Sequence, residues 1–317
     1  MGTACTLLAY ASIMKSLRLL PVLLPLLAAC SRTDAPSPGA PAAPRRLKVM
    51  TTFYPTTYFA SRIAGAHADV VCPLPADQDA AHWQPAPEVL AQYQQADLIV
   101  VNGAHFESWT ETATLPESRV VVCAEPFKKD WIEIKNALTH SHGPAGAHTH
   151  TGVNGHTWPD PINAIAQANA IRDALVARDG AHKDDYLAHA KGLENDLLTL
   201  DAGLKAIMVK EPVFASHPTY NYIAMRYGWN LTNFGLEPDG TPSEDQIAEI
   251  KKAMETNPGV RWMLWEDEPS PAMQAMMKSL GLKTLVFSPA ESRDEKAGDY
   301  LAVMRANLAR LEAAMKQ

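Results

Sequence analysis

Arg46–Phe53 reads RLKVMTTF, and a helical stretch follows from about Pro55 to Ala64. The apolar run is typical of a buried strand, and the same strand–helix order recurs along the chain. Further strands are predicted at Asp69–Leu74, Asp97–Val101, Arg119–Cys123, Val213–Ser216, Asn230–Phe234, Val260–Trp265 and Thr284–Phe287. This alternation predicts an α/β fold with two lobes, each a four-stranded, mainly parallel sheet flanked by helices.

The predicted helices have apolar residues at helical spacing and recognisable ends. They lie at Pro87–Gln95, Phe106–Ala113, Tyr220–Tyr227, Ser243–Glu255, Pro271–Leu280 and Asp299–Met315. In the helix at Ser243–Glu255, Ser243 and Gln246 have the spacing of a capping box.

Two further helical stretches separate the strands into two groups of four. Pro161–Arg178 comes first, and Lys183–Val209 follows it. The second helix would be about 40 Å long at about 1.5 Å per residue, which is the span of a whole domain. We therefore expect an N-terminal lobe over 47–181, a rigid linker helix over 182–210 and a C-terminal lobe over 211–317.

The N-terminus has the pattern of an export signal. Lys15 and Arg18 precede an apolar run, Leu19–Ala29, that is too short to span a bilayer. The run ends in Leu27-Ala28-Ala29-Cys30, which resembles the lipobox of bacterial lipoproteins; an ordinary secretory signal with an incidental cysteine is the alternative. We expect a signal peptide over 1–30, a lipid on Cys30 and a Pro/Ala-rich tether over 31–46.

Charge and cysteine content argue against two classes of function. The 317 residues carry a formal net charge of -7, which disfavours nucleic-acid binding. None of the four cysteines lies in a Cys-x-x-Cys pair, so a thiolate zinc module is not expected. Cys72 and Cys123 fall on strands that a 2-1-3-4 sheet order places roughly 14 Å apart. Because a disulfide needs Cα atoms within roughly 7 Å, we expect two buried free thiols, unless the cysteines lie in the loops beyond those strands.

Histidines gather in Thr139–Pro161, THSHGPAGAHTHTGVNGHTWPDP. The stretch holds five of the chain's eleven histidines, and neutral imidazole is the commonest protein ligand for zinc. Its glycines and Pro144 predict a histidine-rich loop over 139–152, for which we expect weak, fast metal capture; a solvated loop without a role is the alternative. His156 lies apart from the dense cluster, just before the helix at Pro161, and is expected to belong to an ordered site.

Other candidate ligands follow predicted strands. His82 lies in the loop after the second strand, and His217 directly follows the fifth. Glu266 and Glu291 follow the last two strands. Open α/β sheets bind ligands at the carboxyl ends of their strands. We therefore expect these side chains and His156 to converge on one cleft between the lobes.

Several segments together resemble one family over nearly everything from Leu47 to Met315. They are Ala96–Gly103 (ADLIVVNG) with Phe106–Trp109, Gly155–Ala164 (GHTWPDPINA), Ser216–Tyr222 (SHPTYNY) with Arg226–Gly228, and Asp299–Leu301 with Met304–Leu308. In these segments the chain resembles the metal-binding solute-receptor proteins of bacterial ABC importers for zinc and manganese. The His-x-Trp-x-Asp-Pro element is the most specific of them.

The resemblance implies a set of metal ligands. It assigns ligand roles to His156, His82 and His217, and zinc members of the family often carry a histidine-rich loop just before the His156 element. The chain departs from the family at His82-Trp83-Gln84-Pro85, where the family usually has His-x-aromatic-Glu-Pro. It departs again at Ser288-Pro289, where an Asp-Pro turn often supplies the fourth ligand. Glu266 is the favoured replacement, with Glu291 or a water molecule as alternatives.

The implied function is that of an extracytoplasmic receptor. It would bind Zn²⁺ between two lobes and deliver it to the permease and ATPase of an ABC importer, as a monomer anchored by lipid in the periplasm or at the cell surface. Three imidazoles with at most one oxygen favour zinc over Mn²⁺. The alternatives are a manganese receptor of the same kind, a zinc-dependent hydrolase, or a metal-buffering or adhesive lipoprotein. We expect no enzyme, because no His-Glu-x-x-His element is present.

Overall fold

The first of two parallel sheets is built from the N-terminal strands. The computed structural model describes residues 45–76, 78–141, 147–293 and 296–317, with the backbone alone described for 135–141 and 147–151. The strand order is β2-β1-β3-β4, as predicted. The strands are β1 (Leu47–Thr51), β2 (Ala68–Val71), β3 (Leu98–Val101) and β4 (Val120–Val122). Val49 of β1 pairs in parallel with Val70 and with Leu98, so β1 and β3 form the apolar centre of the sheet.

The second sheet repeats this arrangement with the order β10-β9-β7-β8. Its strands are β7 (Val213–Ala215), β8 (Leu231–Asn233), β9 (Trp262–Trp265) and β10 (Lys283–Val286). Every residue of β9 is buried, which is expected of a central strand covered on both faces. The predicted α/β fold with two four-stranded parallel sheets is confirmed.

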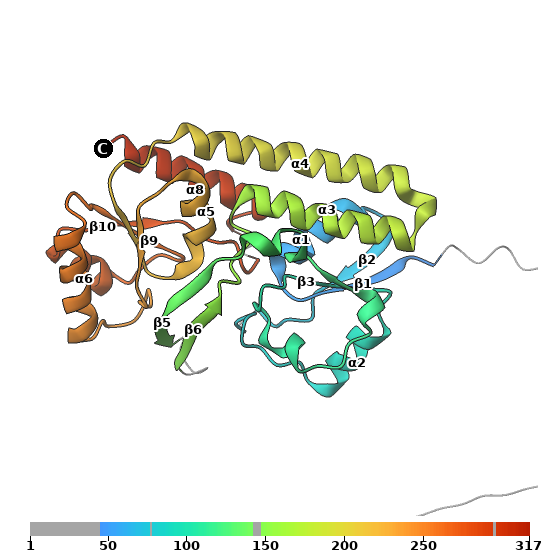
Figure 1. Ribbon diagram of the computed structural model, residues 1–317. Helices are drawn as coiled ribbons and strands as arrows, with labels where there is room; N and C mark the ends of the chain where they lie inside the picture. Colours follow the sequence, from blue (N-terminus) through green and yellow to red (C-terminus); the bar gives the residue numbers. More distant parts are fainter. Residues whose placement is uncertain (1–44, 77, 142–146, 294–295) are drawn as a thin grey trace, which may run out of the picture. The chain divides into compact units, whose positions relative to one another are not determined.

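Four helices form the layer that joins the two halves (Figure 1). They are α1 (Tyr54–Ala64), α3 (Pro161–Arg178), α4 (Lys183–Ala206) and α8 (Tyr300–Met315). The long helix α4 packs against α1, α3 and α8. It therefore connects the helical cover of the first sheet to the last helix of the chain, and it ends at Ala206, before the predicted end at Val209.

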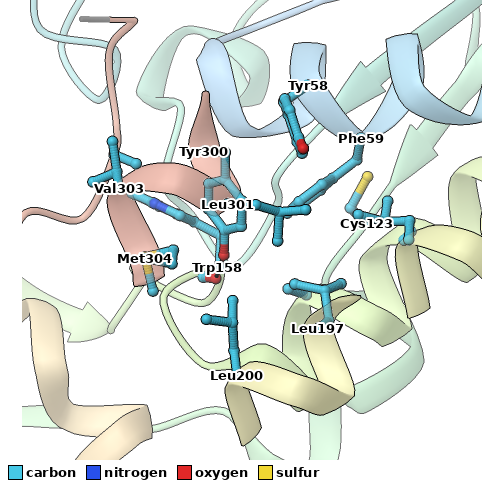
Figure 2. Close-up of a cluster of buried hydrophobic side chains, with 14 of the residues drawn as sticks. Tyr58, Phe59, Cys123, Trp158, Leu197, Leu200, Tyr300, Leu301, Val303 and Met304 are labelled. Atoms are coloured by element: carbon cyan, nitrogen blue, oxygen red, sulfur yellow. Dashed lines mark hydrogen bonds between the residues drawn. The ribbon is translucent and has the colours of Figure 1, made fainter. Parts of the chain in front are cut away.

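The two sheets share one continuous core. A single cluster of buried apolar side chains includes Val49 of β1 and Leu264 of β9. Figure 2 shows its middle, where α1, α4 and α8 meet around Trp158, Leu197 and Tyr300. The Trp158 ring lies 4.7 Å from the rings of both Phe53 and Phe106, and each such aromatic pair contributes about 0.5–1.5 kcal/mol beyond its burial.

The shorter helices surround the sheets. They are α2 (Pro87–Gln95), α5 (Asn221–Tyr227), α6 (Glu244–Thr256) and α7 (Pro271–Ser279). The predicted capping box of α6 is present: Ser243 accepts from the Gln246 amide, and the Gln246 side chain accepts from the Ser243 amide. The helix predicted at Phe106–Ala113 is reduced to a single 3₁₀ turn, Ser108–Glu111, which follows a sharp turn where Gly103, Ala104 and His105 all have positive φ. Other 3₁₀ turns lie at Glu117–Arg119, Glu125–Asp130, Gly180–His182 and Pro218–Tyr220.

The histidine-rich stretch is a β-hairpin, so the prediction of a loop over 139–152 is wrong for its described backbone. Strands β5 (Glu133–Ser141) and β6 (Ala147–Val153) pair in antiparallel register, which sets His140 opposite His148. Residues 148–151 alternate histidine with threonine, and β-branched threonine favours extended backbone. His142 lies outside the described residues, and metal capture by this stretch stays a prediction.

The cysteine prediction is confirmed in its main point. Cys72 and Cys123 are both free thiols, Cys123 buried and Cys72 only half-buried. Burial raises the pKa of both thiols. The expected signal peptide with Cys30, and the tether as far as residue 44, lie outside the described residues. Within the ranges that are described, no helix combines the length and apolarity needed to cross a bilayer.

Candidate metal centre

A cavity of about 600 Å³ collects the predicted ligands. Its lining includes His82, His156, His217 and Glu266, which are separated by long stretches of sequence. The carboxyl ends of β2, β7 and β9 lead into three of them, as expected for parallel sheets. Three further carboxylates also line the cavity, at Asp79, Asp267 and Glu291.

His82 is held by a tight turn that begins at Asp79. The Asp79 carboxylate accepts a hydrogen bond from the Ala81 amide at 2.8 Å, and its other oxygen lies 3.1 Å from Nδ1 of His82. The backbone carbonyl of Asp79 accepts from the amides of His82 and Trp83. An imidazole whose Nδ1 faces a carboxylate is oriented for binding through Nε2.

His156 lies in a buried segment before α3. Its Nδ1 is 3.0 Å from Oδ1 of Asn154, and the rings of Phe106 and Trp158 lie 5.7 and 5.5 Å away on the flanks of the imidazole. Gly155 is required here, because a Cβ at this position would come within 2.9 Å of the Phe106 backbone. The segment is therefore fixed tightly against the loop that follows β3.

Two hydrogen bonds tie this segment to other parts of the fold. The Asn102 side chain at the end of β3 donates to the Gly155 carbonyl at 2.9 Å. The Trp158 indole donates to the Pro289 carbonyl after β10 at 2.8 Å. Each bond joins residues that are far apart in sequence, so the position of His156 depends on both sheets.

His217 follows β7 and is almost completely buried. Its Nδ1 lies 3.3 Å from the Ser216 hydroxyl and 3.7 Å from Glu266, while its Nε2 lies 3.6 Å from Glu237. The Thr219 hydroxyl donates to Glu266 and holds that carboxylate beside the ring. Glu266 is thus positioned both on the cavity wall and on the Nδ1 side of His217.

The cavity is strongly acidic around Glu291. Desolvation raises the pKa of the Glu291 carboxyl well above its usual range, and the charges of Asp79, Glu266 and Asp267 raise it further. Carboxylates gathered in this way repel one another, and a divalent cation among them would relieve that repulsion.

The ligand-type side chains surround the cavity without meeting at one point. In the described part of the chain, no three His, Cys, Asp or Glu side chains are close enough together to hold one metal ion. Sequence reasoning missed Asp79, Asn154 and Glu237, each of which lies beside one of the three histidines. The first two lie three and two residues before their histidines and so had a local signal, whereas Glu237 had none.

The comparison with protein families agrees with this geometry. A family model described as zinc-uptake complex component A, periplasmic, matches residues 49–314. The chain belongs to this ZnuA family.

Relatives in the ZnuA family are similar over most of the chain. The zinc-binding lipoprotein AdcA of Streptococcus pneumoniae is 29% identical over 286 residues, which cover 86% of this chain and 56% of AdcA. The chain thus spans about half the length of that relative. The high-affinity zinc uptake system protein ZnuA of Bacillus subtilis is 27% identical over 295 residues, which cover 89% of this chain and 92% of that protein.

Solved structures show the same fold. The crystal structure of the Zn(II)-bound ZnuA-like domain of S. pneumoniae AdcA superposes with a TM-score of 0.70 at 28% identity. The match covers 86% of this chain and all of that domain.

Proposed function

We propose that this protein binds Zn²⁺ in the cavity and delivers it to an ABC importer. One observation carries the proposal: each of the three cavity histidines has Nδ1 beside an oxygen. These oxygens belong to the Asp79 carboxylate for His82, to the Asn154 amide for His156, and to the Ser216 hydroxyl for His217. Such partners orient imidazoles in zinc sites, and an oxygen that can only accept, as at His82 and His156, directs the lone pair to Nε2.

The proposed ligands are His82, His156 and His217, with Glu266 as the fourth donor and Glu291 as the alternative. Since the donors are spread around the cavity, coordination requires them to move closer together. His82 is the most exposed of the three imidazoles, so it can move at the lowest cost in lost contacts. Three imidazoles with one carboxylate suit tetrahedral zinc better than manganese, which takes more oxygen ligands.

The partners and location follow from the family. The receptor would present Zn²⁺ to a permease powered by an ATPase, working outside the cytoplasm as a monomer with a lipid on Cys30. Two of its relatives are a zinc-binding lipoprotein and a zinc uptake system protein, which supports this proposal. We propose a receptor and not a hydrolase; steady turnover of ester, peptide or β-lactam substrates by the zinc-loaded chain would favour the hydrolase.

The deciding experiment is metal analysis with a competitive zinc titration of the purified full-length chain. Wild type should bind one Zn²⁺ tightly, and His156→Ala should weaken that binding by at least about 100-fold, because a zinc site with one ligand removed loses most of its affinity. His105→Ala is the matched control, since His105 is exposed, contacts Glu111 and does not line the cavity. Equal affinity in His156→Ala and wild type would refute the proposed site.

A further inference from the structure

Asn154 connects two of the proposed ligands. Its side chain is 1% exposed and lies just after β6. Oδ1 accepts a hydrogen bond from the His156 amide at 3.0 Å and lies 3.0 Å from His156 Nδ1. Nδ2 donates to the Pro218 carbonyl at 2.7 Å. One amide group thus contacts the imidazole of His156 and the residue that follows His217.

These contacts determine which way the amide points. The His156 backbone N–H can only donate, so its partner must be the oxygen of Asn154. The Pro218 carbonyl can only accept, so its partner must be the nitrogen. Because the oxygen faces His156 Nδ1, that ring nitrogen carries the proton, and the lone pair of the neutral imidazole is on Nε2.

A second hydrogen bond from the same part of the fold reaches the backbone of Asn154 and does not involve its amide group. The Tyr222 hydroxyl of α5 donates to the backbone carbonyl of Asn154 at 2.9 Å and accepts from the Ile132 amide at 3.1 Å. Tyr222 and Pro218 both lie in the segment that directly follows His217. Asn154 and the segment after His217 thus share two buried hydrogen bonds, one from the Asn154 amide to Pro218 and one from Tyr222 to the Asn154 carbonyl.

We propose that Asn154 is a positioning residue of the zinc site, an inference that rests on the proposed function. It has two roles. It holds His156 as the tautomer that presents Nε2 to the ion, and it sets the spacing between His156 and His217 through Pro218. Side chains that orient metal ligands typically contribute about 10- to 100-fold to metal affinity.

Three variants of the full-length chain separate these roles. Asn154→Ala removes both. Asn154→Asp keeps an acceptor for Nδ1–H and for the His156 amide but places a carboxylate against the Pro218 carbonyl. Tyr222→Phe removes the bond to the Asn154 backbone and leaves the amide untouched, so it is the matched control for loosening of this buried region. The measurements are Zn²⁺ affinity against a competing chelator, the His156 tautomer from ¹⁵N imidazole shifts in metal-free protein, and thermal unfolding.

For Asn154→Ala we expect zinc affinity to fall about 10- to 100-fold and the His156 shifts to report mixed tautomers. For Asn154→Asp we expect the wild-type tautomer with an affinity reduced about tenfold. Tyr222→Phe should unfold at a lower temperature yet lose less than about threefold in affinity.

Two results would overturn the inference: an Asn154→Ala affinity within twofold of wild type with an unchanged tautomer, or a loss in Tyr222→Phe as large as in Asn154→Ala. If wild type binds no zinc, the proposed function fails, and the tautomer of the metal-free protein still decides the first role of Asn154.

Discussion

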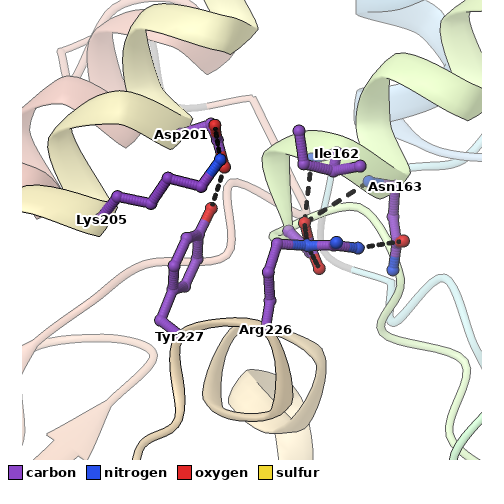
Figure 3. A network of polar contacts seen from close by, with 7 residues as sticks. Ile162, Asn163, Asp201, Lys205, Arg226 and Tyr227 are labelled. Atoms are coloured by element: carbon purple, nitrogen blue, oxygen red, sulfur yellow. Dashed lines mark hydrogen bonds and ion pairs between the residues drawn. The ribbon is translucent and has the colours of Figure 1, made fainter.

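Replacement of Arg226 by methionine tests how strongly the two halves of the fold depend on one buried ion pair. Asp160, at the N-terminus of α3, has a side chain with 0% exposure, and Nε of Arg226 on α5 lies 2.6 and 2.5 Å from its two oxygens. Arg226 also donates to Asn163 at 3.0 Å (Figure 3). Arg226→Met keeps most of the apolar volume but leaves the carboxylate with only the helix amides as partners.

The expected loss in the free energy of unfolding follows from the burial of Asp160. Removal of one partner of a buried ion pair costs about 3–5 kcal/mol because the other charge stays out of water. For a chain of this size, we expect the unfolding temperature to fall by about 6–20 °C, at 2–4 °C for each kcal/mol. Thermal and urea unfolding, followed by circular dichroism, measure the change. The amide of Ile162 still donates to Asp160 at 2.9 Å, which places the cost toward the lower end of this range.

The loss of stability in Arg226→Met should also depend on pH. Burial raises the pKa of the Asp160 carboxyl, and Arg226 pulls it partly back, so the variant has a still higher pKa. A carboxyl with a higher pKa in the folded chain than in the unfolded chain destabilises the fold as pH rises between the two values. The deficit of Arg226→Met should therefore be smallest near the ordinary aspartate pKa of about 3.9 and grow toward pH 7.

Two further variants complete the test. Arg305→Met removes a partner from an exposed pair, in which Arg305 and Asp196 are 53% and 34% exposed, and should cost less than about 1 kcal/mol. Addition of Asp160→Asn to Arg226→Met should recover part of the loss, because no buried charge remains. A cost below about 1 kcal/mol for Arg226→Met, or a loss that does not change with pH, would refute this reasoning.

Three other predictions concern the site. Zinc affinity, measured by chelator competition, should fall as pH drops below about 6.5, since imidazole ligands must lose their protons; equal affinity at pH 5.5 and 7.5 would exclude histidine ligands. Glu266→Gln should weaken zinc binding more than Glu291→Gln in the same titration if Glu266 is the fourth donor, and the reverse order would reassign that role to Glu291. Deletion of Thr139–His150 should leave one tight zinc equivalent by metal analysis, and its loss would place the tight site in the hairpin.

The sequence predicted the elements well where local chemistry determines them. Helix α3 begins at Pro161 and ends at Arg178 as expected, since Asp160 caps the first turn and proline suits the first helical position. The capping box at Ser243 likewise marked the start of α6. The paired strands β5 and β6 were missed because the glycines and proline in this stretch of sequence predicted a loop, while strand pairing depends on the partner strand.

The residues that line the site were also predictable, because parallel sheets place strand ends at one edge, and His82, His217 and Glu266 follow strands. The sequence alone therefore determined the α/β fold class and the side chains that line one cavity. Only the tertiary structure decided which polar groups meet around and behind the site: Asn154 with the Pro218 carbonyl, Glu237 with His217, and Arg226 with Asp160. Each of these contacts joins segments that are brought together by packing of the shared core. Periodicity and spacing in the sequence do not predict which buried polar groups will then meet.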